Sequence, residues 1–382
     1  MKISRIALNG FRNYDFDTAD FSPGTNVIYG ENAQGKTNLL EAVYMLAMGR
    51  SFRTRFDREL IGFGCDSAEI LAEVKSHERE QTVRILLRNG VRKQITVNAV
   101  KKTASELGET LNVVLFCPDD LNLIKEGAAA RRRLMDNAIS QIRPRYAEYL
   151  SQFNKFYESK TRILKDWREK PSLLDTLDEF SDGMCRASAQ LIRYRASFAA
   201  RLAEEAAPIH GEFSGADEKL GIEYMTVSSV KDPTASAKEI FYDLCDHMEA
   251  HKRAELDSGQ CLSGAHKDDL IISINGKNAR SFASQGQTRT AALSIKLAER
   301  EIYLNETGEY PILLLDDVLS ELDTKRQEFV LNRIGGGQTL ITCCEDEGIS
   351  RRTGGKVLHV KNGRIGCCIC ISARAPLSAR TV

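Results

Sequence analysis

The chain has 382 residues, of which 42% are hydrophobic and 28% are charged, as is ordinary for a globular protein of two or three domains. Lys and Arg total 53, as do Asp and Glu, so the composition excludes a uniformly basic chain and leaves only local basic patches. Because there is no signal-peptide pattern, no membrane-spanning apolar stretch and no zinc-type cysteine spacing, we expect a soluble cytoplasmic protein with reduced thiols.

The first third of the chain is predicted to be rich in strands. Apolar and alternating runs indicate strands at 2–8, 25–30, 67–75, 81–90 and 94–100, with a turn at Asn89-Gly90. A helix is expected at 38–48, because apolar residues recur there along one face: Leu39, Leu40, Val43, Leu46 and Ala47.

The middle of the chain is predicted to be helical. Apolar residues recur at helical spacing from about 128 to 207, and Pro171 divides them into a hairpin that is too short for an extended coiled-coil arm. A strand at 221–230 and a helix at 235–256 follow. From about 262 the chain returns to a strand–turn–helix order, with strands at 269–277, 311–315 and 338–344 and a helix at 288–304.

The stretch GENAQGKT is predicted to bind the phosphates of a nucleotide. It matches G-x-x-x-x-G-K-[ST] between an apolar strand and a helix, a context in which backbone N–H groups and the helix N-terminus surround phosphate oxygens. Lys36 is expected on the β- and γ-phosphates and Thr37 on Mg²⁺. The predicted nucleotide contacts are Gly30, Glu31, Asn32, Ala33, Gln34, Gly35, Lys36 and Thr37.

Two aspartates follow the buried strand Ile312 to Leu315. At the carboxyl end of a parallel strand, Asp316 is expected beside the phosphate loop as a metal ligand. Asp317 is expected to be the general base that activates the attacking water. The alternative is an ordinary strand followed by an acidic turn.

A second anion site is predicted at the segment SQGQ, which comprises Ser284, Gln285, Gly286 and Gln287. A serine hydroxyl, a glycine N–H and a helix N-terminus can together bind an anion. Two anion sites in one chain fit a head-to-tail dimer that buries ATP between the phosphate loop of one subunit and the SQGQ of the other, with Ser284 acting in catalysis. The alternative is an ordinary turn with a helix cap.

Two arginine clusters are predicted to contact DNA phosphates without sequence specificity. One lies beside the phosphate-loop helix and the other at the start of the helical region: Arg50, Arg53 and Arg55, and Arg131, Arg132, Arg143 and Arg145. The alternative is a solvated helix face or an internal ion-pair network, for example a pair between Arg133 and Asp136.

These motifs together resemble the RecF family of bacterial recombinational-repair ATPases, which are related to the heads of structural-maintenance-of-chromosomes proteins. The resemblance is carried by LNGFRNY, GENAQGKTNLLEAVY, GRSFRT, SGAHKDDL, the SQGQ segment and PILLLDDVLSELD, and spans residues 1 to about 345. Ala265, Lys267 and Thr288 depart from the family pattern, and the tail GCCICISARAPLSARTV does not resemble it.

The resemblance implies an α/β fold, with an ABC-type P-loop ATPase head built from both ends of the chain. The head (lobe I) is expected at 1–127 and 258–365, a helical insert (lobe II) at 128–257 and a disordered tail at 366–382. It also implies ATP and Mg²⁺ as ligands, slow DNA-stimulated hydrolysis, and ATP-driven dimerisation on DNA at single-strand gaps near the nucleoid. RecR- and RecO-like mediators are the implied partners.

Three rival functions are considered. A transporter ATPase would carry its signature much nearer the phosphate loop than Ser284, and a chromosome-condensing head would need hundreds of heptad residues between its halves. The third rival is a clamp that binds ATP without hydrolysing it. It differs from the ATPase only in whether Asp317 acts as a general base.

Overall fold

The computed structural model describes residues 1–77, 79–215, 217–344 and 348–367. It divides into two compact units. Unit 1 comprises Met1–Thr103, Leu115–Cys117 and the described residues from Pro311 onward, and unit 2 comprises Ala104–Val114 and the described residues of Pro118–Tyr310. No helix of the described residues is long and apolar enough to cross a membrane.

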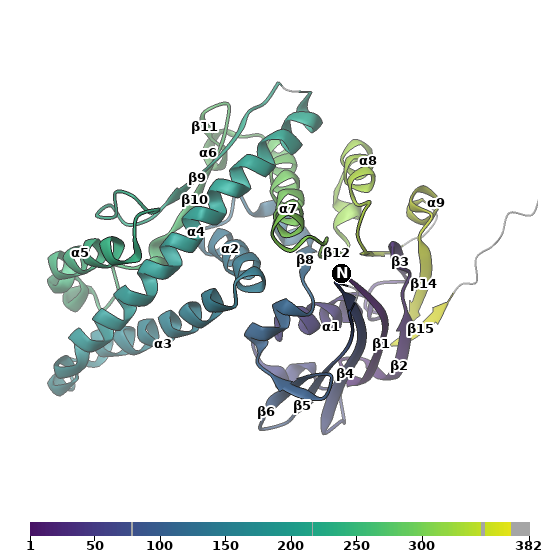
Figure 1. Ribbon diagram of the computed structural model, residues 1–382, viewed down its shortest axis with the longest axis horizontal. Coiled ribbons are helices and arrows are strands. Elements are labelled where there is room, and N and C mark those ends of the chain that lie inside the picture. Colours follow the sequence, from purple (N-terminus) through teal and green to yellow (C-terminus); the bar gives the residue numbers. More distant parts are fainter. Residues whose placement is uncertain (78, 216, 345–347, 368–382) are drawn as a thin grey trace, which may run out of the picture. The chain divides into compact units, whose positions relative to one another are not determined.

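Unit 1 contains two sheets (Figure 1). The first is an antiparallel sheet in the order β2-β1-β4-β5-β6-β7, built from Tyr14–Asp20, Lys2–Phe11, Ser67–Ser76, Arg79–Arg88, Val91–Val97 and Val100–Lys102. The second has the order β15-β14-β3-β13-β12-β8, built from Arg364–Cys367, Lys356–Lys361, Thr25–Tyr29, Thr339–Cys343, Ile312–Leu315 and Val113–Phe116; of β8, only Leu115 and Phe116 belong to unit 1. In the second sheet β14, β3, β13 and β12 are parallel, so their carboxyl ends lie along one edge.

The phosphate-loop helix α1 (Lys36–Met48) lies between these sheets. It contacts β13 of the second sheet and β4 and β5 of the first, and almost all of its residues are buried. The predicted helix is confirmed and its predicted apolar residues are buried, but burial extends around the helix beyond that face. A helix that packs on both sides has no solvent face, and even Glu41 of α1 is fully buried.

Four shorter helices complete the described part of unit 1. The 3-10 helix Asp57–Leu60 follows α1, the 3-10 helix Val318–Glu321 and α8 (Thr324–Arg333) follow β12, and α9 (Ile349–Thr353) follows β13. The predicted turn at Asn89-Gly90 is confirmed between β5 and β6. The strands β2, β7, β8, β14 and β15 were not predicted. Because β15 extends to Cys367, the predicted tail begins too early, and residues 368–382 lie outside the described residues.

Unit 2 is organised around one long helix, α4 (Leu177–Ser214). It packs on α3 (Pro144–Asp166), as the predicted hairpin requires, and also on α5 (Ala237–Ser258), α7 (Gln285–Thr307) and β9 (Leu220–Met225) (Figure 1). The remaining elements are α2 (Ala128–Ile142), α6 (Ala279–Phe282), β10 (Asp269–Ile274), β11 (Lys277–Asn278) and short 3-10 helices at Ala104–Glu109, Pro118–Asn122, Pro171–Thr176 and Ala265–Lys267.

The two units have different boundaries from the predicted head and insert. The helix that follows SQGQ was predicted in the head, but α7 packs on α4 and belongs to unit 2. Sequence order does not show this packing, because α4 and α7 are separated by β9, α5 and β10. The lobes at 1–127 with 258–365 and at 128–257 stay a prediction.

A buried network of charges holds unit 2 together. Asp268 is fully buried, and it accepts hydrogen bonds from Arg195 Nη1 at 2.6 Å, Tyr224 Oη at 2.6 Å and Thr226 Oγ1 at 2.7 Å. Arg195 also bonds Asp136, at 2.8 Å from Nη2 to Oδ1. Asp136 is thus paired with Arg195, and the pair between Arg133 and Asp136 that was considered as an alternative is not formed. The network joins α2, α4, β9 and the SGAHKDDL segment.

His266 of that segment is half-buried and lies against two aromatic rings. Its ring centroid lies 4.7 Å from that of Tyr157 and 6.2 Å from that of Phe153, both on α3. Its Nε2 bonds the Cys261 carbonyl at 2.9 Å, whereas Nδ1 is buried with no partner among the described residues. Burial lowers the pKa of His266 from 6.5 to about 4.

We expect acid to destabilise unit 2 through His266. Between the ordinary pKa of 6.5 and the folded pKa of about 4, the unfolded chain binds a proton that the folded chain does not. Stability should therefore fall as the pH is lowered through this range, by up to about 3 kcal/mol from this group. Urea unfolding followed by far-UV circular dichroism would measure it. His266→Gln, which can still donate to the carbonyl but does not titrate, should flatten the pH dependence; equal slopes for both proteins would contradict this assignment.

Candidate nucleotide site

The phosphate loop connects β3 to α1 in unit 1. Gly35 is the N-cap of α1, with φ of 118°, and a Cβ there would lie 2.8 Å from the Asn13 side chain. Glycine is therefore required at this position by both conformation and space. The first N–H groups of α1 have no partner within the helix and are available to an anion.

Lys36 is folded back onto its own loop. Its Nζ donates to the carbonyl of Gly30 at 2.7 Å and to that of Glu31 at 3.0 Å, and the side chain is buried. Its other contact is the Cys344 thiol at 4.0 Å, so the ammonium has no carboxylate partner among the described residues, and an anion in the loop would supply the counter-charge.

Two turns outside the predicted motif hold the loop in place. The Gln34 carbonyl accepts hydrogen bonds from Asn13 Nδ2 at 2.9 Å and from the Gly363 N–H at 3.0 Å. Tyr14 Oη donates to the Gly35 carbonyl at 2.9 Å. Gly363 has φ of 67°, and a Cβ there would lie 2.0 Å from the Asn13 carbonyl oxygen, so the β14–β15 turn also needs glycine.

Asp316 lies beside Thr37 at the carboxyl end of β12. The hydroxyls of Thr37 and Thr342 both donate to Asp316 Oδ1, each at 2.9 Å. Burial raises the pKa of Asp316, and these two hydrogen bonds oppose that rise by favouring the carboxylate. An oxygen pair from Thr37 and Asp316 is a ligand set that suits Mg²⁺.

Asp317 has an unusual backbone and an unpaired side chain. Its φ of 49° is left-handed, and its Oδ1 is buried with no hydrogen-bond partner among the described residues. Its N–H donates to Thr342 Oγ1 at 2.8 Å. A buried carboxylate oxygen without a partner is costly, and a bound water would satisfy it.

Thr342, which sequence reasoning missed, therefore connects both aspartates. It belongs to β13, the strand between β3 and β12, and its hydroxyl is buried. The strand itself was predicted, but its place between β3 and β12 was not, because strand order depends on contacts distant in sequence.

Ser284 begins helix α7 in unit 2. Its hydroxyl accepts from the Gln287 N–H at 3.2 Å, and Gln287 Oε1 accepts from the Ser284 N–H at 2.9 Å, so the pair forms a capping box. Gln287 Nε2 also donates to Glu218 Oε1 at 2.7 Å. Within one chain, SQGQ is thus a helix cap, and its predicted role at a phosphate stays a prediction.

Three of the predicted DNA-binding arginines, all in unit 2, bind other groups of the protein. Arg131 is buried, with a bidentate ion pair to Asp269 at 2.7 and 2.9 Å and three further bonds to backbone carbonyls. Because removing a partner from a buried pair costs about 3–5 kcal/mol, Arg131 is a structural residue and its prediction as a DNA contact is wrong. Arg132 donates to the Asp268 carbonyl at 2.6 Å, and Arg143 pairs with Glu306 at 2.5 Å.

Arg55 and Arg145 are exposed, and neither has a partner among the described residues. Arg50 is exposed too, whereas Arg53 bonds Asn38 Oδ1 at 2.7 Å and lies 3.7 Å from the buried Glu41. Arg12 also pairs with Glu41, with both contacts at 2.8 Å. Arg53 therefore helps to balance a buried carboxylate of α1, and Arg55 and Arg145 are the stronger candidates for DNA contact.

Comparison with known proteins agrees with this site. The family model described as "RecF/RecN/SMC N terminal domain" matches residues 2–363. Proteins named "DNA replication and repair protein RecF" from Acetivibrio thermocellus and Bacillus mycoides are 39% identical over 363 residues and 40% identical over 374 residues. These alignments cover 94% and 96% of this chain, and 98% and 99% of the relatives.

A solved structure of the same family has the same fold. It is titled "Structure of the recombination mediator protein RecF-ATPrS in RecFOR pathway" and is 33% identical, with a TM-score of 0.89. The match covers 96% of this chain and 98% of that one. The predicted fold class, an α/β head of the ABC-type ATPase kind, is confirmed.

We expect Thr342→Val to impair nucleotide hydrolysis while leaving binding intact. The valine keeps the branched shape but leaves the part-buried Asp317 N–H without an acceptor, so the aspartate is no longer held in place. A loss of about 1–3 kcal/mol in transition-state stabilisation would lower the rate roughly 5- to 160-fold. ATP affinity without Mg²⁺, measured by calorimetry, should stay unchanged because the phosphate loop is untouched.

Two matched variants control for folding and packing. Thr342→Ser keeps the hydroxyl and should retain most of the activity. Thr339→Val lies on the same strand and removes a buried hydroxyl that has no hydrogen-bond partner within the described part of the chain, so it should have no effect on turnover. Normal turnover in Thr342→Val would show that this hydroxyl does not position the aspartates.

Proposed function

The chain belongs to the RecF family of DNA replication and repair proteins, and on that premise we propose that it is an ATP-dependent DNA clamp of recombinational repair. The proposal rests on one contact: the hydroxyls of Thr37 and Thr342 both donate to the same carboxylate oxygen of Asp316. The N–H of the next residue, Asp317, donates to the same Thr342 hydroxyl. This arrangement has the donors, acceptors and unpaired carboxylate that nucleotide hydrolysis needs.

In the proposed reaction, Lys36 exchanges its two loop carbonyls for the β- and γ-phosphates of ATP. The N–H groups at the start of α1 bind the same phosphates. Thr37 and Asp316 would hold Mg²⁺, which when bound offsets the phosphate charge. Asp317 accepts the proton of the attacking water, and Thr342 keeps that carboxylate next to Asp316.

Ser284, Gln285, Gly286 and Gln287 are proposed to complete the site in a second copy of the chain. A helix N-terminus with a serine hydroxyl suits the γ-phosphate, and a shared ATP would couple nucleotide binding to dimerisation. Hydrolysis would then remove the shared phosphate and open the dimer.

DNA is proposed to bind through phosphate contacts, with Arg55 and Arg145 first among the candidates. Binding of this kind is independent of sequence and falls steeply with salt. RecR- and RecO-like mediators are the proposed partners at single-strand gaps, where the clamp would support recombinase loading in the bacterial cytoplasm. We also propose that DNA stimulates a slow ATPase.

We expect Asp317→Asn to bind ATP and Mg²⁺ but not to hydrolyse ATP. Asparagine tolerates the left-handed backbone and keeps the side-chain shape, so only the base is lost. Phosphate release should fall to background with and without gapped duplex DNA, and the ATP-bound complex on DNA should persist.

Glu328→Gln, an exposed change on α8, is the control and should behave as the parent. Turnover at the parental rate in Asp317→Asn would instead favour a different base. A parent that binds ATP but never hydrolyses it, even with gapped DNA, would favour the clamp without turnover.

We expect Ser284→Arg to prevent ATP-dependent dimerisation without weakening ATP binding to the monomer. The bulky side chain would fill the space for the partner's phosphate, whereas the phosphate loop is unchanged. Light scattering with and without ATP measures dimerisation, and a nucleotide titration measures affinity.

Ser236→Arg is a closely matched control, because Ser236 forms the same type of capping box with Glu239 at the start of α5. It should lose a helix cap, worth about 1 kcal/mol, without affecting dimerisation. If the two variants dimerise alike, SQGQ is only a helix cap.

A further inference from the structure

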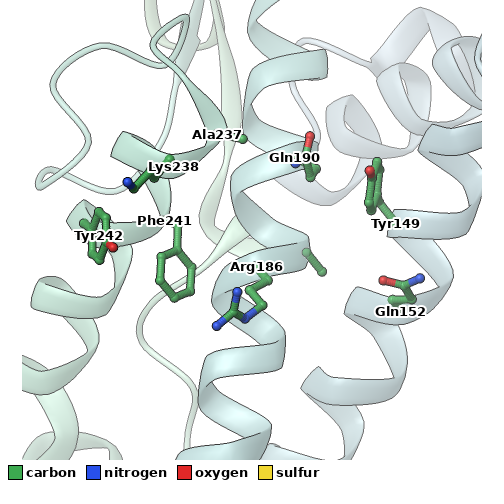
Figure 2. Close-up of a pocket in the computed structure, with 9 residues that line it drawn as sticks. Tyr149, Gln152, Arg186, Gln190, Ala237, Lys238, Phe241 and Tyr242 are labelled. Atoms are coloured by element: carbon green, nitrogen blue, oxygen red, sulfur yellow. The ribbon is translucent and has the colours of Figure 1, made fainter.

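Unit 2 contains a groove that the nucleotide site does not use. It has a volume of about 500 Å³ and lies between α3, α4 and α5. Figure 2 shows Arg186 and Gln190 on the central helix, Tyr149 and Gln152 on one side, and Lys238, Phe241 and Tyr242 on the other. Ala187 and Ala237 complete the lining, which contains no Asp or Glu.

Several polar groups of the groove are available to a ligand. Gln152, Gln190 and Lys238 have no hydrogen-bond or ion-pair partner among the described residues. A glutamine amide can donate and accept at once, which is what a peptide group requires of its partner. Two such amides on neighbouring helices therefore suit a peptide backbone better than a ligand that only accepts.

Arg186 is held in a fixed orientation at the groove. Its Nε donates to Asp182 Oδ2 at 2.7 Å, and its guanidinium lies 4.8 Å from the Phe241 ring centroid. Its Nη2 also lies 3.4 Å from Asp182 Oδ1, whereas Nη1 has no partner among the described residues, so a ligand carboxylate would meet a cation that is already oriented. Lys238 adds a second, unpaired charge.

Aromatic side chains supply the apolar part of the groove. Phe241 and Tyr242 lie with ring centroids 5.4 Å apart on α5, and Tyr242 is exposed even though it is large and aromatic. Tyr149 contributes a ring from α3. Exposed aromatic rings beside cations are typical of protein-recognition sites.

We propose that this groove binds a short peptide segment of a partner protein, one that carries a carboxylate for Lys238 and Arg186 and an apolar or aromatic side chain for the rings. The glutamine amides would bind its backbone. The volume is within the range of pockets that enclose a few side chains. This site is independent of ATP and goes beyond the proposed clamp function.

Charges just outside the groove disfavour a nucleic acid as the occupant. Each of the three helices carries a carboxylate one turn from a lining residue: Glu148 from Gln152, Asp182 from Arg186 and Asp246 from Tyr242. Basic residues lie at similar spacing, namely Arg145, Lys155 and Arg193, so the charge around the groove is mixed and not continuously basic. A phosphate chain that continued beyond the groove would meet these carboxylates, whereas a peptide with a single acidic side chain would not.

The test uses the full chain and fluorescein-labelled peptides that contain one Glu and one Phe at varied spacing in a Gly/Ser background. In anisotropy titrations we expect saturable binding at a preferred spacing, weakened about tenfold or more when Glu is replaced by Gln. Lys238→Glu should cause a similar loss. Arg193→Glu, an exposed charge reversal on α4 outside the groove, should not.

Alanine methyl NMR would place the peptide. The methyl signals of Ala187 and Ala237 should shift on peptide addition, while that of Ala42, buried in α1, should not. The proposal is overturned if no spacing gives saturable binding, if Arg193→Glu weakens binding as much as Lys238→Glu, or if a short oligothymidine rather than the peptide shifts Ala187 and Ala237. ATP hydrolysis should be normal in Lys238→Glu, which separates this test from that of the clamp.

Discussion

One carboxylate oxygen of Asp316 accepts hydrogen bonds from two threonines, and the nucleotide site depends on this contact. Thr37 arrives from the phosphate loop and Thr342 from β13, so three separate parts of the chain meet at Oδ1. Since Asp316 is buried, the carboxylate would be costly without these hydroxyls. The same contact fixes Thr37 and, through Thr342, the backbone of Asp317. The positions of the proposed metal ligand and of the proposed base are thus set by one shared acceptor.

Unit 2 uses its charges in a different way. Arg195 and Asp268 form a pair in its interior, and Arg131 and Asp269 form another at its edge, with carbonyls and hydroxyls occupying the remaining donors and acceptors. Breaking either pair would leave an uncompensated charge inside, at about 3–5 kcal/mol. Arginines in this region of the sequence can therefore form internal ion pairs instead of contacting DNA. The arginines available to a ligand are those outside these buried pairs, such as the exposed Arg145 and Arg186, which lines the groove.

The parts of the site that could be predicted from sequence are those encoded within a few residues. The phosphate loop needs glycine, lysine and threonine at fixed spacing, and the buried strand before Asp316 identifies that carboxylate. Thr342 could not be predicted, because its role follows from the position of β13 between β3 and β12. Asn13 and Gly363 support the loop across similarly long separations.

Burial was the other property that sequence patterns did not reveal. Helix α1 carries apolar residues beyond the one predicted face, but only the two sheets show why. Arg131 looked like its neighbours in the cluster, yet it alone among the predicted DNA-contact arginines is buried. Helical spacing cannot distinguish these cases, since it describes one element and burial depends on what packs against it.

The order of strands around β3 also has a consequence for how the chain is made. Both neighbours of β3 in its sheet, β13 and β14, come from residues after 338, and Gln338 binds the backbone of Ile3 at 2.7 and 2.8 Å. During synthesis from the N-terminus, the phosphate loop therefore leaves the ribosome long before the strands that support it. Unit 2, which is nearly continuous in sequence, is complete earlier. The phosphate loop can reach its final geometry only when translation is almost finished, because a shorter product lacks β13, β14 and the Gly363 contact.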